Sequence, residues 1–345
     1  MKRLIFDLTL EELTQQLTTW GEPSYRAIQV WQGLYHSLWN APHQFTGLST
    51  TLRQRLAEEF SFSHLTPQQT LRSQDGETVK ILFALPDQRA IETVLMHYDV
   101  RQTLCISTQA GCAMGCVFCA TGQMGFQRHL SSGEIVEQVL HFARLLRSEQ
   151  TALTNIVIMG MGEPFHNYQS TLDAVDRLNH PKGLNLGARR FTISTVGLVP
   201  LIRQFGAEQR QINLAISLHA ANDKLRSSLL PINRKYPLPD LIQACRDYIA
   251  QTNRRITFEW ALIQDVNDSP QHAIELASLV KGLLCHINLI PLNPTHQYPA
   301  SGSTRQRAAA FAAVLEQANI PCTIRIRRGV DIQAGCGQLA SRNQT

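Results

Sequence analysis

The sequence predicts an α/β protein: a partial (β/α)6 barrel with a small N-terminal helical domain and a β-hairpin extension. Apolar residues recur at helical spacing over roughly the first 60 residues, and two apolar runs joined by a polar turn follow. From about residue 100, strand-like and helix-like segments alternate. Repeated βα units imply a parallel sheet with helices outside, and six crossovers without a further unit indicate an open barrel rather than a closed one.

The N-terminal domain is expected over residues 1–65. Thr9 and Glu12 have the spacing of a capping box, so a first helix begins there, and Gly21 ends it. Two further amphipathic helices are expected on either side of a break at residues 42–47.

Residues 66–100 are expected to hold a linker and the hairpin extension. The segment 61–70 contains Pro67 and two glutamines, which is typical of a linker. The apolar-rich runs 78–85 and 90–96 are separated by a short polar turn, which predicts a β-hairpin.

Residues 101–345 are assigned to the barrel and to a C-terminal catalytic loop. Strands are expected at 103–107, 155–159, 190–195, 212–217, 255–262, 286–290 and 323–327. Helices are expected at 132–147, 168–179, 199–206, 239–251, 270–281 and 303–318. Ligands of such sheets bind at the C-terminal ends of the parallel strands, so functional residues are sought there.

Composition limits the classes of protein that remain. Hydrophobic residues make up 43% and charged residues 17% of the 345 residues, which excludes a mostly disordered chain. No stretch approaches the roughly 18 consecutive apolar residues of a membrane span, and the N-terminus lacks the pattern of a secretory signal. We therefore expect a cytoplasmic protein without membrane contact. The net charge of +5 permits nucleic acid as a partner but does not require it.

The cysteines point to a metal site. Four of the eight fall between Cys105 and Cys119, and none precedes them. In a reducing compartment, clustered cysteines indicate metal binding or catalysis rather than disulfides. Cys245, Cys285 and Cys322 lie inside helix or strand patterns and are expected to be core residues.

Cys112, Cys116 and Cys119 have C-x3-C-x2-C spacing directly after the first barrel strand, and Gly111 and Gly115 let this loop turn tightly. Three thiolates cannot fill the four ligand positions of a four-iron cube, so one iron stays open to a chelating molecule, as at a catalytic metal site. The alternatives are a zinc site with a remote fourth ligand and a group of unliganded core cysteines. No further paired cysteine or histidine motif supports zinc.

This loop resembles that of the radical-SAM superfamily. The longer strings Cys105–Cys112 and Cys119–Phe126 resemble, more specifically, the RlmN/Cfr family of RNA adenine methyltransferases, and in particular its RlmN-type members. The resemblance extends over nearly the whole chain, through Ile91–Thr93, Met159–Pro164, Ser194–Thr195, Ser217–His219, Pro231–Asn233, Asn293–Pro294 and Ala334–Gln338. It implies a radical-SAM partial barrel with one [4Fe-4S] cluster on Cys112, Cys116 and Cys119, and two S-adenosyl-L-methionine molecules used per turnover.

The resemblance also implies the reaction. One S-adenosylmethionine methylates Cys336, and a second, bound at the open iron, is cleaved to a 5′-deoxyadenosyl radical that takes hydrogen from this methyl group. The methylene adds to carbon 2 of an adenine, Cys105 attacks the sulfur of Cys336 in a transient disulfide, and Glu92 accepts the ring proton. A radical route suits a carbon that is neither acidic nor nucleophilic. Without the resemblance, Cys336 is an incidental thiol and Glu92 a solvated strand carboxylate.

The same resemblance assigns the cofactor contacts. Gly162 and Glu163 follow the second barrel strand and would bind the methionine part, with Glu163 accepting from its ammonium group. The adenosyl, ribose and methionine parts would contact residues at other strand ends, namely Ser194, Ser217, Leu218, His219 and Asn293. His219 is interpreted as a binding contact rather than a base. Taken alone, it is a structural histidine and Gly162 an ordinary turn residue.

Folded RNA is the expected partner. The implied substrates are an adenosine of the peptidyl-transferase centre in 23S rRNA and the adenosine 3′ to the tRNA anticodon, with the N-terminal domain gripping RNA while the base is splayed out. The basic residues expected beside the barrel mouth are Arg189–Arg190, Arg234–Lys235 and Arg325–Arg328, with ordinary surface charge as the alternative for each. A flavodoxin-like electron donor and a monomeric state are also expected.

Two other functions remain open. Cfr-like methylation at carbon 8 uses the same cofactor and cysteines but presents a different face of the base. A non-catalytic iron–sulfur protein that binds RNA or senses redox state would form no 5′-deoxyadenosine, and it would leave Cys105 and Cys336 without a role.

Overall fold

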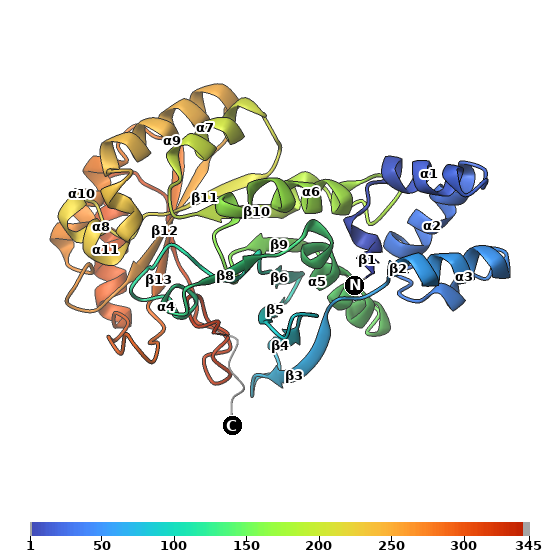
Figure 1. Cartoon of the computed structure of the whole chain (residues 1–345). Coiled ribbons are helices and arrows are strands. Elements are labelled where there is room, and N and C mark those ends of the chain that lie inside the picture. Colours follow the sequence, from blue (N-terminus) through green and yellow to red (C-terminus); the bar gives the residue numbers. More distant parts are fainter. Residues whose placement is uncertain (1, 341–345) are drawn as a thin grey trace.

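The computed structural model describes residues 2–340 and contains one large sheet (Figure 1). Its strands are β3 (Thr66–Arg72), β4 (Thr78–Ala84), β5 (Ala90–Tyr98), β6 (Arg101–Cys105), β9 (Asn155–Ile158), β10 (Phe191–Thr195), β11 (Asn213–Ser217), β12 (Ile256–Leu262), β13 (Cys285–Pro291) and β14 (Cys322–Ile324). Their spatial order is β14-β13-β12-β11-β10-β9-β6-β5-β4-β3. The strands from β6 to β14 pair in parallel, and β5, β4 and β3 extend the sheet antiparallel from β6. β14 and β3 are the two end strands of this order and do not pair with each other. The sheet is therefore open, as expected for a partial barrel.

Helices connect the parallel strands. They are α5 (Ser132–Ser148), α6 (Tyr168–Asn179), α7 (Val199–Ala207), α8 (Asp223–Leu229), α9 (Leu238–Thr252), α10 (Pro270–Leu279) and α11 (Arg305–Gln317). Single 3-10 turns occur at Ile5–Asp7, Pro42–Gln44, Pro164–Asn167, Ala188–Arg190 and Pro231–Arg234. The predicted barrel strands and helices are confirmed, with ends that differ by a few residues. The short helix α8 is additional, and Asn222 caps it by accepting from the Leu225 backbone N–H.

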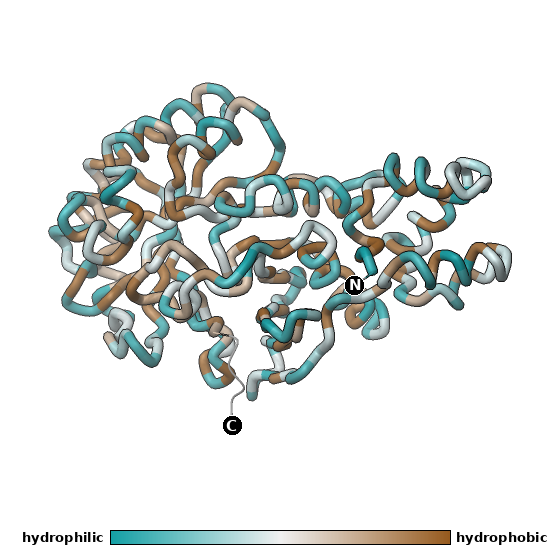
Figure 2. Tube along the Cα trace, in the orientation of Figure 1, coloured by the Kyte–Doolittle hydropathy of each residue, from teal (hydrophilic) through white to brown (hydrophobic). Residues whose placement is uncertain are grey.

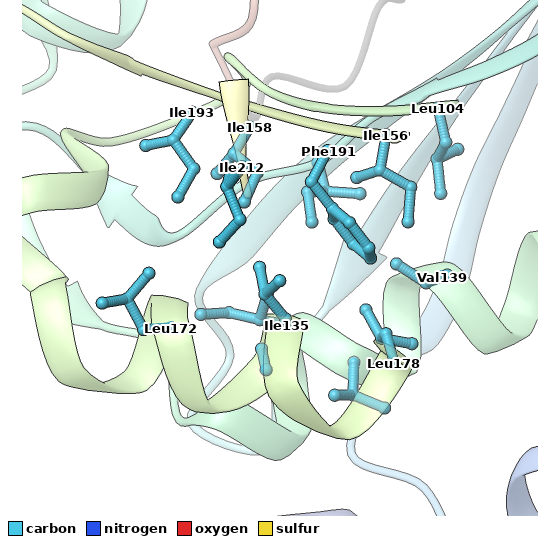
Figure 3. Packing of buried hydrophobic residues seen from close by; sticks show 14 of the residues in the cluster. Leu104, Ile135, Val139, Ile156, Ile158, Leu172, Leu178, Phe191, Ile193 and Ile212 are labelled. Carbon is cyan, nitrogen blue, oxygen red and sulfur yellow. The ribbon is translucent and has the colours of Figure 1, made fainter. Parts of the chain in front are cut away.

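Helix α5 packs on the sheet through an apolar stripe (Figure 3). Ile135 and Val139 are four residues apart, so they lie on the same face of the helix. They join a core with Leu104, Ile156 and Phe191 of the sheet, and each of these side chains is 0% exposed. Burying such a side chain stabilises the fold by about 1.5–3 kcal/mol. Hydrophilic residues recur on the outer turns of α7 and α9 (Figure 2).

The N-terminal helices are α1 (Leu10–Thr19), α2 (Tyr25–Tyr35) and α3 (Thr50–Glu59), beside the short parallel pair β1 (Arg3–Leu4) and β2 (Phe60–Ser61). The predicted capping box is present: the Glu12 backbone N–H donates to Thr9 Oγ1 at 3.1 Å, and the Thr9 N–H donates to Glu12 Oε2 at 2.8 Å. Asp7 joins these helices to the barrel, because its Oδ1 accepts from the Gly133 N–H at 2.7 Å in the first turn of α5.

The expectation of a linker over residues 61–70 is wrong for its second half. Thr66–Arg72 form β3, which pairs antiparallel with β4. Pro67 is compatible with this strand because it lies at a register shift on the edge of the sheet, where its missing N–H costs no ladder bond. The strand is mostly exposed, so its polar composition matches that of a linker.

Two further elements, which the sequence pattern does not predict, frame the loop Cys112–Cys119. These are the antiparallel pair β7 (Gln109–Gly111) and β8 (Phe126–His129), and the short helix α4 (Ala120–Gln123). Gly111 has φ +71°, and a Cβ there would collide with the Gly125 carbonyl, so this crossing needs glycine.

Throughout the described part of the chain, every helix is too short or too polar to cross a membrane.

Candidate active site

A cavity of about 420 Å³ lies against the inner face of the open barrel. Alternate residues of the strands point into it, such as Thr103 and Cys105 of β6 and Thr257 and Glu259 of β12. At the C-terminal ends of the strands, the loop Cys112–Cys119 and the C-terminal segment complete its lining. Residues from distant parts of the sequence meet here because parallel strands end at one edge of their sheet.

Cys112, Cys116 and Cys119 all line this cavity. Their loop folds back on itself, since the Cys119 N–H donates to the Cys116 carbonyl at 3.2 Å. It packs tightly on Gly122, where a Cβ would come within 3.0 Å of the Cys116 backbone. Burial raises the pKa of Cys112 to about 12, so this thiol stays neutral until a metal displaces its proton.

The donor set fits an iron–sulfur cube. Thiolate is the ligand that such clusters use, and three thiolates from one short loop would leave one iron of a bound cube free. Within residues 2–340, no three histidine, cysteine or carboxylate side chains are grouped as they would be around a single metal ion. A cube needs a different arrangement, because each thiolate binds its own iron.

Cys336 reaches the same cavity on the segment Gly335–Gly337. This segment is joined to the residues after the cluster loop: the Ala120 N–H donates to the Gly337 carbonyl at 2.7 Å, and the Thr121 hydroxyl donates to the Leu339 carbonyl at 2.6 Å. Cys336 is an exposed residue, but the cavity walls desolvate its thiol, which raises the thiol pKa. Negative charge on Glu259 raises the pKa further.

Cys105 ends β6 and lines the cavity as well. Burial raises the pKa of Cys105 to about 12, and charge on Cys336 raises it in addition, so the two thiols are near enough to influence each other. All eight cysteines lie in the described part of the chain, and all are free thiols. The fold thus places in one cavity, as free thiols, the two cysteines that the family resemblance pairs.

Glu92 is placed differently from expectation. It is 2% exposed and is not one of the described residues that line the cavity, although Val94 and Met96, on the same side of β5, do line it. Its Oε1 forms an ion pair with Lys80 Nζ at 2.9 Å, and its Oε2 accepts from the Ala340 N–H at 2.8 Å. The C-terminal segment therefore covers this carboxylate.

Gly162 and Glu163 follow β9 and line the cavity. Gly162 has φ +102°, and a Cβ there would come within 2.6 Å of the Gln109 side chain, so only glycine fits. The Glu163 carboxylate accepts from the Val196 N–H at 2.9 Å and from the Phe165 N–H at 3.1 Å. Burial raises the pKa of Glu163 to about 7, so a cationic ligand would draw it into the ionised form.

Ser194 and Ser217 end neighbouring strands and line the cavity, with their Oγ atoms 3.4 Å apart. Leu218 does not reach the cavity. Its side chain is fully buried in the core, and its backbone N–H donates to the Glu259 carbonyl at 3.0 Å. The structure thus places two of these three residues where a ligand can touch them.

His219 lines the cavity in a left-handed backbone conformation, with φ +58°. Its Nδ1 accepts from the Ala261 N–H at 2.9 Å, which places the ring proton on Nε2. Burial lowers the pKa of His219 to about 3, and charge on Arg226 acts in the same direction, so the ring is neutral. A neutral ring that offers an N–H donor suits a binding contact rather than a base.

Asn293 follows β13, lines the cavity and is 3% exposed. Its Nδ2 donates to the Cys336 carbonyl at 3.4 Å, while its Oδ1 is buried without a hydrogen-bond partner. A buried acceptor without a donor costs roughly 1–3 kcal/mol unless a ligand satisfies it. This oxygen therefore fits a polar ligand bound next to Cys336.

The sequence reading missed Glu259. This residue of β12 is buried, lines the cavity and accepts from Asn288 Nδ2 at 3.0 Å. Burial raises its carboxyl pKa to about 6. A single carboxylate in the mostly apolar strand Ile256–Leu262 is the signal that could identify it.

Arg226 of α8 was missed as well, and it organises the strand ends. Its guanidinium is fully buried and donates to the carbonyls of Val196 at 2.7 Å and Leu218 at 3.1 Å, and to Asn233 Oδ1 at 2.8 Å. It thereby fixes the loops that follow β10 and β11. No motif in the sequence separates this arginine from those on the surface.

The basic residues divide into two groups. Arg325, Arg327 and Arg328 line the cavity. Arg234 and Lys235 are exposed and follow Pro231 closely. Pro231 lies next to the cluster loop, because its ring would be 3.7 Å from a Cβ added at Gly115. The expectation that Arg189–Arg190 lie beside the mouth is wrong. They precede β10, so they lie at the opposite edge of the sheet from the cluster loop.

The remaining cysteines behave as expected. Cys245 and Cys285 are buried in the main hydrophobic core, and Cys322 packs against it from a partly exposed position. Burial raises the pKa of Cys245 to about 12, which keeps that thiol neutral.

Comparison with known proteins identifies the family. Residues 106–277 match the family model described as the radical SAM superfamily, and residues 4–61 match that of the ribosomal RNA large subunit methyltransferase N-terminal domain. A "probable dual-specificity RNA methyltransferase RlmN" of Chloroflexus aurantiacus is 50% identical, covering 99% of this chain and 94% of the relative. A "dual-specificity RNA methyltransferase RlmN 1" of Myxococcus xanthus is 48% identical, covering 97% and 93%.

A solved structure agrees with these relatives. The crystal structure of a radical SAM methyltransferase from Sphaerobacter thermophilus matches with a TM-score of 0.97 and 50% identity, over 99% of this chain and 100% of the other. Both the barrel and the N-terminal helices are therefore shared. The superfamily implies a [4Fe-4S] cluster and S-adenosylmethionine, which fit the cysteine loop and the cavity with its few buried polar groups. The chain belongs to the RlmN family of radical-SAM methyltransferases.

Proposed function

We propose that this enzyme methylates carbon 2 of adenosine in folded RNA, both in the peptidyl-transferase centre of 23S rRNA and 3′ to the tRNA anticodon. The observation that carries the proposal is the placement of Cys105 and Cys336 in the same cavity as the three-cysteine loop. A cluster protein without this chemistry needs no two further thiols there. The relatives named as dual-specificity RNA methyltransferases support RNA as the substrate.

The lining of the cavity supports the choice of cofactor residues. Cys112, Cys116 and Cys119 would hold one [4Fe-4S] cluster, with its fourth iron open to S-adenosylmethionine. The S-adenosylmethionine contacts would be Gly162, Glu163, Ser194, Ser217, His219 and Asn293, with Leu218 supporting them from the core. When bound and reduced, the cluster and S-adenosylmethionine supply the radical chemistry that activates a methyl group on sulfur. Two S-adenosylmethionine molecules are used per product, because Cys336 must first be methylated.

The later steps belong to the chain's own side chains. Cys336 carries the methyl carbon to the adenine. Once that carbon is bonded to the ring, Glu92 accepts the ring proton, and the unpaired electron left on the adduct would return to the oxidised cluster. The Cys105 thiolate then attacks the Cys336 sulfur, so an S–S bond forms as the S–C bond to the product breaks, and the released carbon takes up a proton to become the methyl group. Reduction of the disulfide restores both thiols for the next turnover.

RNA contact is proposed at the cavity and on the N-terminal helices. Arg325, Arg327 and Arg328 at the cavity would neutralise phosphates, with Arg234 and Lys235 near the cluster loop. Residues 1–65 would grip folded RNA, the hairpin extension of residues 66–100 would flank the site, and residues 101–345 would carry the chemistry. We further propose a cytoplasmic monomer with a flavodoxin-like electron donor.

Anaerobic reconstitution with iron and sulfide, followed by assay on unmethylated rRNA and tRNA, tests the proposal. Mass spectrometry of the RNA should show 2-methyladenosine, and the reaction should release 5′-deoxyadenosine. Cys336→Ala should abolish methylation while keeping the cluster absorbance of the wild type. The appearance of 8-methyladenosine would assign the Cfr-like reaction instead. A reconstituted protein that forms neither 5′-deoxyadenosine nor methylated RNA would be a non-catalytic cluster protein.

A further inference from the structure

The C-terminal segment crosses the open side of the barrel (Figure 1). After β14, the Arg325 N–H donates to the Leu289 carbonyl of β13 at 2.8 Å. Arg328 then reaches the hairpin, where its Nη1 donates to the His97 carbonyl at 3.2 Å. Residues 333–340, which we call the Cys336 loop, follow. The position of Cys336 therefore depends on contacts that the hairpin makes.

Lys80 of β4 and Glu92 of β5 form a buried ion pair beneath the Cys336 loop. Lys80 Nζ lies 2.9 Å from Glu92 Oε1, and the residues are 3% and 2% exposed. Lys80 Nζ also donates to the Gln333 carbonyl at 3.2 Å, and Glu92 Oε2 accepts from the Ala340 N–H at 2.8 Å. The ion pair thus holds the loop at both of its ends, one on each side of Cys336.

The Cys336 loop lies between the cavity and this ion pair. Ala334 and Leu339, which adjoin the two bonded loop residues, line the cavity, whereas Lys80 and Glu92 lie behind them. With the loop seated, an adenine in the cavity cannot reach the Glu92 carboxylate. A carboxylate buried in this way needs its counter-ion, because removing one member of a buried pair leaves an uncompensated charge.

We propose that Lys80 is a positioning residue that seats the Cys336 loop over Glu92, and that release of the loop is what exposes Glu92 to the adenine. This inference rests on the proposed function, in which Cys336 carries the methyl group and Glu92 accepts the ring proton. The seated loop covers Glu92, so its ends at Gln333 and Ala340 must move before Glu92 can accept the proton of the adduct that Cys336 holds. Lys80 keeps a partner in both, because its ion pair with Glu92 does not involve the loop.

Hydrogen–deuterium exchange of peptides covering residues 333–340 tests the seating in the cluster-loaded enzyme. Lys80→Met should speed exchange of the Ala340 amide about tenfold or more, since that amide loses an ordered charged acceptor. Lys80→Arg should restore most of the protection. The matched control is Lys2→Met. Lys2 Nζ also donates to a backbone carbonyl, that of Ala57, at 2.6 Å. Lys2 belongs to the N-terminal domain, far from the Cys336 loop.

Kinetics then separate positioning from general damage. Lys80→Met should lower kcat for RNA methylation about tenfold, leave the KM for S-adenosylmethionine unchanged and be rescued by Lys80→Arg. Should Lys80→Met fail to fold, Lys80→Gln removes the charge while its amide can still donate to Gln333. If a folded Lys80 variant showed the amide exchange and the turnover of the wild type, the role of Lys80 would be refuted and the proposed function would be unaffected. A wild-type enzyme that methylates no RNA would overturn the proposed function, whatever the exchange rates show.

Discussion

Replacing Glu259 with glutamine tests how the cavity controls the charges that face Cys336. Glu259 is 7% exposed, and its Oε1 accepts from Asn288 Nδ2 at 3.0 Å. A glutamine in the same place has nearly the same shape and keeps that acceptor. The substitution therefore removes one negative charge without opening a cavity, so changes in stability report on the charge itself.

The magnitude follows from the pKa. Burial raises the pKa of Glu259 from its ordinary value of 4.5 to about 6, so the folded protein binds this proton more tightly than the unfolded chain. The stability that this group contributes is fully present below pH 4.5 and is lost as the pH rises through about 6. The gap between the two values corresponds to about 2 kcal/mol. Glu259→Gln should therefore match the wild type near pH 4 and exceed it by about 2 kcal/mol near pH 8.

Urea unfolding of the cluster-free protein across this pH range measures the effect. Alkylation of Cys336 by iodoacetamide, followed by peptide mass spectrometry, gives a second readout. Charge on Glu259 raises the pKa of Cys336, so the variant should hold more thiolate at pH 8 and react faster. A variant with the same pH profile of stability as the wild type would refute the reasoning, and unchanged alkylation would show that the two groups are not coupled.

Three further outcomes are expected. Cys105→Ala should trap RNA covalently on the protein, visible as a band on denaturing gels, because release of the product needs the second thiol; continued turnover without an adduct would reassign that step. Burial lowers the pKa of His219 from 6.5 to about 3, so the wild type should lose stability as the pH falls below 6.5. In urea unfolding, the free energy of unfolding of His219→Asn should fall by about 5 kcal/mol less than that of the wild type by pH 3. Gly335→Ala would place a Cβ 2.8 Å from the Asn293 amide carbon and should lower RNA methylation several-fold with cluster absorbance intact. The control Gly187→Ala, with no atom within 4 Å of its Cβ, should leave product formation at the wild-type level.

Local patterns predicted most of the fold. Strands such as β10 and β13 alternate a buried apolar face with a half-buried face, and the connecting helices carry a 3.6-residue apolar stripe. The capping box of Thr9 and Glu12 marks the start of α1 because both of its bonds lie within four residues of sequence. The loop Cys112–Cys119 was recognisable for the same reason, since its chemistry is contained in eight consecutive residues.

The errors arose where a residue's environment comes from distant segments. The strand β3 has the composition of a linker because an exposed edge strand lacks the alternation of a half-buried one. Arg189–Arg190 were placed at the wrong edge of the sheet because they come before β10 rather than after it. The carboxylate in the strand Ile256–Leu262 marks Glu259 as unusual, but its proximity to Cys336 follows only from the packing of distant segments.

The sequence by itself determined the succession of strands and helices, the cluster loop and the presence of two further thiols, Cys105 in the first barrel strand and Cys336 after the last. Only the tertiary structure decided which groups meet. It put Cys105 and Cys336 in one cavity, covered Glu92 with the C-terminal segment and gave it Lys80 as a counter-ion. The physical reason is that periodicity and capping are set by bonds within a few residues, whereas desolvation and charge pairing depend on what the folded chain packs around a group.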